Sequence, residues 1–348
     1  MVKTTIWDVR EYTNNLIDYP YLSEIIATYR QGGLVALPTE TVYGLGADAT
    51  NEEAVQGIYQ AKGRPSDNPL IVHIYDTKQL EDFVENVSET TERLMEAFWP
   101  GPITFILPLK PGYLCQSVTG GLNSVAVRMP SHPVARTLLK EVALPIAAPS
   151  ANLSGRPSPT TFEHVYYDLE GRIDGIIQST QSEAGLESTV LDCTSFPFRI
   201  ARPGTITRSM LNEILPNGID AMRDESIDKP IAPGMKYKHY APETPLKIFE
   251  RLNEKLDATQ KDWSQTAFIL PATLLSYIPK QAQTIILSET ESDIKQANHN
   301  LYAALHQLDQ LDGIAHAYIY GYPDHDDAEA LHNRMVKAAN HQFIKGEW

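Results

Sequence analysis

Residues 62–73 read KGRPSDNPLIVH, and the rest of the chain is organised around this stretch. Its first half predicts a turn, because it contains a glycine, two prolines, an aspartate and an asparagine. Its second half continues into an apolar run, residues 70–74, that predicts a short buried strand. Lys62 and Arg64 therefore lie on a loop held by a sheet, where ligand-binding groups are common. Two cations suit a polyanion; from this stretch alone, an exposed turn with solvated charges is an equally good interpretation.

Composition indicates a globular protein with one large domain or two ordinary ones. The chain has 348 residues, of which 42% are hydrophobic. Cys115 and Cys193 are the only cysteines, which excludes a disulfide framework or a cysteine-rich zinc site and favours a reducing compartment. Residues 1–10 lack the pattern of a signal peptide, and the apolar run 267–279 is too short to span a bilayer. We expect a soluble, cytoplasmic protein.

The formal net charge is −15, with a pI near 5.1, and the acidic residues are scattered along the chain. Such a protein repels a phosphate backbone at long range, so a dedicated nucleic-acid binder is disfavoured. A small anionic ligand in a locally basic pocket remains compatible with this charge.

The order of predicted elements indicates two α/β domains joined by a linker. Residues 1–215 alternate helices and strands, which predicts an α/β domain with a partly antiparallel sheet. Residues 216–245 are rich in Pro, Gly and charged residues and predict a linker. Residues 246–348 repeat a β-α rhythm that includes a helix expected over 252–260, and predict a smaller three-layer α/β domain.

The middle of the linker, residues 233–242, reads PGMKYKHYAP. It is unusually rich in aromatic and basic residues for a passive tether. We expect His239 and Tyr240 to close over a ligand pocket as a lid that excludes water. A plain tether is the alternative interpretation.

Common nucleotide and catalytic motifs are absent or weak. Residues 44–49 match G-x-G-x-x-A, but they lie several residues beyond the preceding predicted strand, so a glycine-rich bend is the better interpretation. The sequence holds no G-x-x-x-x-G-K-[ST] loop, no G-x-S-x-G elbow and no H-E-x-x-H helix.

Polar side chains instead follow the ends of predicted strands. They occupy residues 38–46, 62–73, 124–128, 148–158, 187–190 and 202–204. In open α/β sheets ligands bind near strand ends. The four cations there, on a net acidic protein, would complement a triphosphate: Lys62, Arg64, Arg128 and Arg202. The residues alone therefore predict a nucleotide site that offers hydroxyls and amides rather than a nucleophile.

These segments resemble the signature of the YrdC-like family. The motifs that carry the resemblance are PTETVYGLG at 38–46, KGRP at 62–65 with NPL at 68–70, WPGPIT at 99–104, VRMP at 127–130, APSAN at 148–152 and ESTV at 187–190. The linker motif at 233–242 and NRMVKAA at 333–339 resemble the family's long form, which carries an extra C-terminal domain. The resemblance implies a YrdC-like twisted mixed sheet with flanking helices, followed by a smaller Rossmann-like three-layer α/β domain.

The activity that the resemblance implies is a nucleotidyl transfer. L-Threonine, bicarbonate and ATP would give L-threonylcarbamoyladenylate and pyrophosphate. The product would supply the threonylcarbamoyl modification of adenosine 37 in tRNA through a separate transferase. Mg²⁺ would enter with the ATP phosphates, with no metal-ligating side chains of its own.

Residue roles follow from the same resemblance, position by position. The family's K-x-R…S-x-N tetrad matches Lys62, Arg64, Ser150 and Asn152. The residues expected to contact ATP are Arg64, Asn68, Ser124, Ser150, Ser158, Arg202 and Tyr240. The residues expected to surround threonine are Thr41, His73, Arg128, Ser188 and, through its backbone, Ala148.

Two other functions are alternatives to this nucleotidyl transfer. YrdC-like folds are also associated with double-stranded RNA binding, which the acidic balance disfavours here. A carbamoyl-transfer branch in hydrogenase maturation carries cysteine-rich zinc fingers, which two cysteines cannot build.

Overall fold

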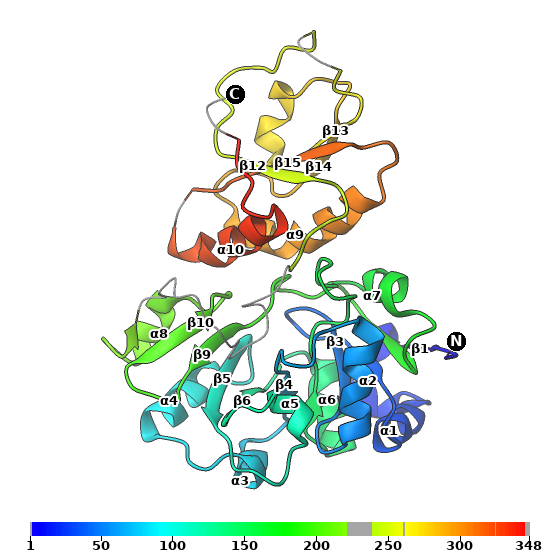
Figure 1. Ribbon diagram of the computed structural model, residues 1–348, viewed down its shortest axis with the longest axis vertical. Helices are drawn as coiled ribbons and strands as arrows, with labels where there is room; N and C mark the ends of the chain where they lie inside the picture. The colour runs from blue at the N-terminus through cyan, green and yellow to red at the C-terminus, as the bar shows by residue number, and fades with distance from the viewer. Residues whose placement is uncertain (1, 221–238, 260–261, 324, 345–348) are drawn as a thin grey trace. The chain divides into compact units, whose positions relative to one another are not determined.

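The computed structural model describes residues 2–220, 239–259, 262–323 and 325–344. Most of the predicted linker lies outside these residues, so the structure does not test its predicted role as a lid. Contacts divide the chain into two compact units, drawn in Figure 1. Unit 1 comprises residues 1–154, 159–183 and 187–237, and unit 2 comprises residues 155–158, 184–186 and 238–348.

Unit 1 is built on one mixed sheet. Its strand order is β1-β8-β2-β3-β7-β4-β6-β5-β9-β10-β11. The strands span Thr5–Asp8 (β1), Val35–Leu37 (β2), Gly44–Asp48 (β3), Ile71–His73 (β4), Ile103–Pro108 (β5), Ser124–Arg128 (β6), Ile146–Ala147 (β7), Gly175–Gln178 (β8), Thr189–Asp192 (β9), Phe198–Arg202 (β10) and Ile219–Asp220 (β11). β4 pairs parallel with β6, whereas β5 pairs antiparallel with β6. The expected mixed α/β fold is confirmed.

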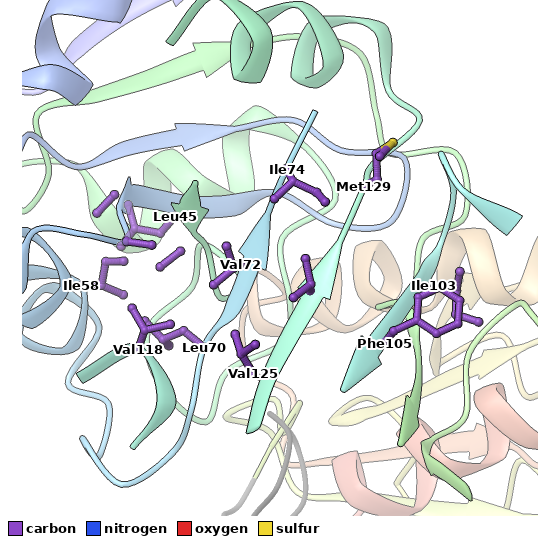
Figure 2. Packing of buried hydrophobic residues seen from close by; sticks show 14 of the residues in the cluster. Leu45, Ile58, Leu70, Val72, Ile74, Ile103, Phe105, Val118, Val125 and Met129 are labelled. Carbon is purple, nitrogen blue, oxygen red and sulfur yellow. The ribbon is translucent and has the colours of Figure 1, made fainter. Parts of the chain in front are cut away.

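Helices cover both faces of this sheet (Figure 1). They span Leu22–Arg30 (α1), Glu52–Lys62 (α2), Leu80–Phe83 (α3), Glu89–Phe98 (α4), Gln116–Thr119 (α5), Pro133–Val142 (α6), Phe162–Leu169 (α7) and Arg208–Ile214 (α8). α1 and α6 bury apolar side chains in one cluster against Val35 and Leu37. α2, α4 and α7 bury theirs in another, where Ile58 packs with Leu45 and Val72 (Figure 2). Successive strand residues thus face opposite layers, as the pleat requires.

Helix α2 ends at Lys62, and local interactions determine where this helix begins and ends. The Asn51 side chain accepts a hydrogen bond from the Ala54 amide at 3.1 Å, which caps the N-terminus. Gly63 follows the last helical residue with φ of 62°, the left-handed conformation that ends helices and that glycine adopts without strain. The helix therefore stops directly after Lys62.

Several elements of unit 1 differ from the sequence-based expectation. Strand β1 and helix α5 were not predicted, and β11 lies within the predicted linker. Residues 44–48, interpreted as a bend, form strand β3 antiparallel to β2. Glycine is required inside β3 for a packing reason. A Cβ on Gly46 would lie 2.8 Å from Tyr29 Oη and 2.9 Å from Ile146 Cγ2. These glycines allow close packing rather than a phosphate-binding turn.

Unit 2 contains a four-stranded parallel sheet in the order β12-β15-β13-β14. Its strands are Leu246–Phe249 (β12), Thr266–Leu270 (β13), Gln283–Ile286 (β14) and His316–Tyr320 (β15), with helices Ile294–Asp309 (α9) and Glu329–Ala338 (α10). This agrees with the expected smaller α/β domain.

The prediction of a helix over residues 252–260 is wrong, because the described residues 252–259 form no helix or strand. Asp257 accepts hydrogen bonds from the Thr259 amide and hydroxyl, at 2.8 and 2.7 Å. Such side-chain bonds compete with helical ones and favour a turn. Between β13 and β14 the chain forms a 3₁₀ helix, Ala272–Tyr277, that was not expected. Among all described residues, no helix combines the length and apolarity needed to cross a bilayer.

Candidate active site

Most of the predicted site residues in unit 1 gather around β4 and its neighbours. Lys62, Arg64 and Asn68 lie on the chain entering β4, and His73 ends that strand. β7 and β6 pair with β4 on either side, and Ala148 N donates to Ile71 O at 2.9 Å. Of the expected ATP residues, Arg64 and Asn68 thus lie at the beginning of β4. Of the expected threonine residues, His73 and Arg128 lie at its end, whereas Ala148 lies beside its beginning. A three-residue strand separates its two ends by about 7 Å.

Lys62 is buried, with 2% of its surface exposed. Its ammonium donates hydrogen bonds to the carbonyls of Ser150 and Asn152. Burial lowers the pKa of Lys62 well below its ordinary value, and the nearby charge of Arg64 acts in the same direction. Lys62 therefore holds the loop that follows β7, and an approaching phosphate group would favour its charged form.

Arg64 lies on the turn after α2 and is half-buried. Its guanidinium contacts the carbonyl oxygens of Asn68 and Pro69, the latter at 3.1 Å. These bonds fold the side chain over the turn instead of into solvent. Asn68 is 2% exposed, and its Oδ1 is a buried acceptor with no hydrogen-bond donor among the residues that the structure describes. A buried amide oxygen of this kind suits a ligand that donates a hydrogen bond.

Helix α7 holds the loop that contains Ser150 and Asn152 in place. The Asp168 carboxylate, buried on α7, accepts a hydrogen bond from Leu153 N at 3.0 Å. Ser150 also forms an isolated bridge with Gly44 at the end of β2–β3. Lys62 is therefore brought to the backbone of Ser150 and Asn152, close enough to Arg64 to feel its charge, and the catalytic role of these four residues remains a prediction.

Arg128 is the centre of the second group. It ends β6, is 4% exposed, and forms an ion pair with Glu40 Oε1 at 2.6 Å. Its Nη1 donates to the Thr41 hydroxyl at 2.6 Å, and its Nε to Gly101 O at 3.4 Å. Burial alone would raise the pKa of Glu40, but the Arg128 guanidinium offsets this and leaves that pKa lowered. The Glu40 carboxylate is therefore ionised at neutral pH.

His73 lies directly opposite Arg128 in the β4–β6 register. Burial lowers the pKa of His73 to about 3, and the positive charge of Arg128 contributes. Its Nδ1 is 3.2 Å from Ile71 O, so this nitrogen carries the proton of a neutral imidazole. His73 can therefore exchange hydrogen bonds with a substrate hydroxyl without adding charge.

Ser188 and Arg202 are in direct contact. Arg202 Nη2 donates to Ser188 Oγ at 3.1 Å and to Ser188 O at 2.9 Å, and Thr104 Oγ1 lies 2.8 Å from Ser188 Oγ. Arg202, expected to contact ATP, thus lies against a residue expected to contact threonine. Gly204 permits this contact, because a Cβ there would lie 2.3 Å from Thr189 N.

Three further residues were predicted to contact ATP, namely Ser124, Ser158 and Tyr240. Ser124 begins β6, at the same end of β4 and β6 as the Lys62 turn. Ser158 and Tyr240 belong to unit 2. There Ser158 O lies 3.3 Å from His306 Nε2, and Tyr240 is buried with its ring 5.5 Å from that of Tyr302. Contact between ATP and these three residues stays a prediction.

Residues that sequence reasoning did not assign are also part of the site. Glu40, Thr104 and Asp168 are buried polar groups that hold predicted residues in place. Glu40 stands inside the PTETVYGLG motif, but its partner lies 88 positions away, so the motif could not identify the ion pair. A surface hollow of about 790 Å³ between α3 and α4 contains none of the predicted site residues.

The chemistry available is binding and charge stabilisation. The described residues hold no group of three or more His, Cys, Asp or Glu side chains that could bind a metal ion. Both described cysteines, Cys115 and Cys193, have pKa values raised by burial, so neither is an activated thiol. Cations, hydroxyls and a neutral imidazole remain, which suit substrates that carry phosphate and carboxylate groups.

Two family models match the chain. The Sua5/YciO/YrdC model, described as telomere recombination, matches residues 27–204, and the model of the threonylcarbamoyl-AMP synthase C-terminal domain matches residues 206–340. A Bacillus subtilis protein named threonylcarbamoyl-AMP synthase is 42% identical over 99% of this chain and 100% of its own length. The chain belongs to the threonylcarbamoyl-AMP synthase family.

Other relatives agree with this membership. A threonylcarbamoyl-AMP synthase of Pyrococcus abyssi is 40% identical over 91% of this chain and 93% of its own. The structure of P. abyssi Sua5 complexed with L-threonine superposes with a TM-score of 0.86 at 36% identity, covering 99% of this chain and 100% of the other. Escherichia coli YciO, with a TM-score of 0.50 at 23% identity over 59% of this chain and 96% of its own, shares the fold.

Proposed function

We propose that this protein is an enzyme that condenses L-threonine, bicarbonate and ATP into L-threonylcarbamoyladenylate and releases pyrophosphate. The observation that carries the proposal is the buried Arg128, held by Glu40 and Thr41 about one short strand away from the Lys62 loop. This arrangement offers one subsite for a carboxylate and an adjacent one for phosphates. Relatives that carry the synthase name over their whole length, and the threonine bound by the P. abyssi protein, support it.

At the threonine subsite, Arg128 would bind the substrate carboxylate, because its planar guanidinium forms paired hydrogen bonds with such groups. Thr41, Ser188 and the neutral His73 would direct hydrogen bonds to the rest of the amino acid. The Ala148 backbone, whose amide donates to Ile71 O at the beginning of β4, would also contact the amino acid.

The reaction needs no covalent bond to the protein. The threonine amine and bicarbonate give a carbamate with loss of water, and a carbamate oxygen attacks the α-phosphate while pyrophosphate leaves. Lys62 and Arg64 would stabilise the negative charge that develops on the phosphates, and the Lys62–Ser150–Asn152 loop would position the nucleotide. Catalysis on this account is positioning plus electrostatics.

Magnesium would enter with ATP. A divalent ion held by the nucleotide phosphates supplies charge neutralisation to the leaving pyrophosphate. The two acids placed in the site are engaged by protein groups, Glu40 by the Arg128 guanidinium and Asp168 by Leu153 N, so the phosphates themselves are the natural ligands. We also propose that the enzyme is cytoplasmic and that its product passes to a separate transferase that modifies tRNA.

Pyrophosphate release tests the proposal. Purified protein with ATP and Mg²⁺ is assayed with threonine and bicarbonate each omitted in turn. Release that requires both co-substrates is expected. Release with neither, or none under any combination, would refute the synthase and leave a nucleotide-binding or RNA-binding protein.

A further inference from the structure

We propose that Glu40 is a positioning residue for threonine binding, which acts by fixing the orientation of the Arg128 guanidinium. The inference rests on the proposed function and deepens it. Glu40 would not touch the substrate itself; it would set how Arg128 presents its N–H groups.

The contacts of Arg128 restrict its orientation. Nη1 donates to Thr41 Oγ1 at 2.6 Å and Nε to Gly101 O at 3.4 Å, while Nη2 forms an ion pair with Glu40 Oε1 at 2.6 Å. A guanidinium has five N–H donors in one plane, so two hydrogen bonds and the ion pair restrict where the remaining donors point. Glu40 supplies the only opposite charge among these contacts.

Glu40 is buried beside Arg128. It is 7% exposed, and among the described residues neither of its carboxylate oxygens has a hydrogen-bond partner, so the ion pair with Arg128 is what compensates its charge. The Arg128 guanidinium lowers the pKa of Glu40 against the effect of burial, which keeps the carboxylate ionised. A buried carboxylate compensated in this way favours one orientation of the guanidinium.

A second consequence concerns charge. An unpaired buried Arg128 would attract any anion, including the phosphates of ATP, whereas the Glu40–Arg128 pair has no net charge. Its remaining donors select a carboxylate by geometry rather than by long-range attraction. Loss of Glu40 should therefore weaken threonine binding without weakening ATP binding.

The test compares Glu40→Gln and Glu40→Ala with wild type. Glu40→Gln keeps the shape and one acceptor oxygen, so it tests the charge with the least disturbance of folding. We expect the KM for threonine to rise about tenfold in Glu40→Gln, equivalent to about 1.4 kcal/mol, and further in Glu40→Ala. The KM for ATP should stay within about twofold of wild type. Threonine binding measured by calorimetry, without turnover, should weaken in parallel.

A double-variant cycle tests whether Glu40 acts through Arg128. In an Arg128→Lys background, Glu40→Gln should change the threonine KM less than twofold, because the guanidinium it orients is gone. Asp192→Asn serves as the control for loss of a partly buried carboxylate, since Asp192 pairs with Arg199 at 3.7 Å on β9–β10. It should leave the threonine KM unchanged.

Two results would overturn the inference. One is an unchanged threonine KM and affinity in both Glu40 variants. The other is an equal loss for threonine and ATP together with a lowered melting temperature, which would show a purely structural role. If wild type itself releases no pyrophosphate, the proposed function fails, and that outcome is separate from either result.

Discussion

Arg64 is the most accessible cation of the candidate site, because Lys62, Arg128 and Arg202 are almost fully buried. Its hydrogen bonds to the carbonyl oxygens of Asn68, at 3.4 Å, and Pro69, at 3.1 Å, have uncharged acceptors. Phosphate oxygens, which are charged, can replace these acceptors. Removal of Arg64 therefore removes charge from the proposed nucleotide subsite.

The first prediction concerns this residue. Arg64→Ala should lower the rate of pyrophosphate release by two orders of magnitude or more, about 3 kcal/mol, while the melting temperature changes little. Arg199→Ala, a half-exposed arginine on β10, is the matched control and should retain full activity. An Arg64→Ala enzyme with normal turnover would contradict the role assigned to the tetrad.

A second residue-scale prediction follows from buried histidines. Burial lowers the pKa of His73 to about 3 and that of His164 to about 4, below the ordinary value of 6.5. As the pH falls below 6.5, the unfolded chain takes up protons that the folded chain does not, so the free energy of unfolding decreases. Between about pH 7 and pH 5.5 each such histidine should remove about 1 kcal/mol of stability.

Urea unfolding at these two pH values measures the effect. His164 is outside the site, and its Nδ1 accepts a hydrogen bond from Thr160 N at 3.2 Å, which an asparagine oxygen can replace. His164→Asn should therefore lose about 1 kcal/mol less than wild type on acidification. Identical pH dependence in the two proteins would mean that His164 titrates normally in the folded state.

At the scale of elements, the connection after β10 fixes the position of Ser188. Gly204 passes so close to the start of β9 that a Cβ would lie 2.3 Å from Thr189 N and 2.8 Å from the Ser188 carbonyl carbon. Both neighbours are backbone atoms, so neither can rotate away. The backbone must move, and Ser188 and Arg202 move with it.

Gly204→Ala should accordingly destabilise the protein by about 2 kcal/mol and raise the KM for threonine. Gly57→Ala is the control, because Gly57 lies inside α2 and its Cβ would meet Leu34 at an ordinary 3.4 Å. That variant should be neutral or more stable by up to about 1 kcal/mol. Equal urea midpoints for Gly204→Ala and wild type would show that the connection relaxes freely.

Sequence patterns correctly predicted the elements whose hydrophobic periodicity and capping residues indicate the same boundaries. α2, with its Asn51 cap and Gly63 stop, is such a case. They failed where a local interaction competes, as with Asp257 and Thr259 in the missing helix over 252–260. They also failed for β3, because an open bend and a tightly packed strand can share the same glycines.

The same limit applies to the candidate site. Motifs predicted which segments carry the chemistry, and the structure brings Lys62 to Ser150 and Asn152 and Thr41 to Arg128. No pattern indicated that Glu40 pairs with Arg128 or that Arg202 contacts Ser188, because those pairings depend on strand order in a sheet with several crossovers. Partners of buried charges are properties of the fold, not of the motif.

At the scale of the whole molecule, the net charge of −15 opposes direct capture of tRNA. In the absence of nucleotide we expect tRNA binding at 150 mM salt to be weaker than about 10 µM, typical of non-specific contacts. Fluorescence anisotropy with labelled tRNA at several salt concentrations measures this. Sub-micromolar affinity with a steep salt slope would favour the alternative of an RNA-binding module.

The central claim is that threonine, bicarbonate and ATP meet in one site and leave as a single adenylate. Its most direct measurement is mass spectrometry of the product formed from ¹³C-bicarbonate, threonine, ATP and Mg²⁺. We predict an adenylate that contains threonine and one ¹³C atom, formed in step with pyrophosphate. Pyrophosphate release with an unlabelled adenylate, or with AMP alone and no adenylate at any time point, would contradict the account.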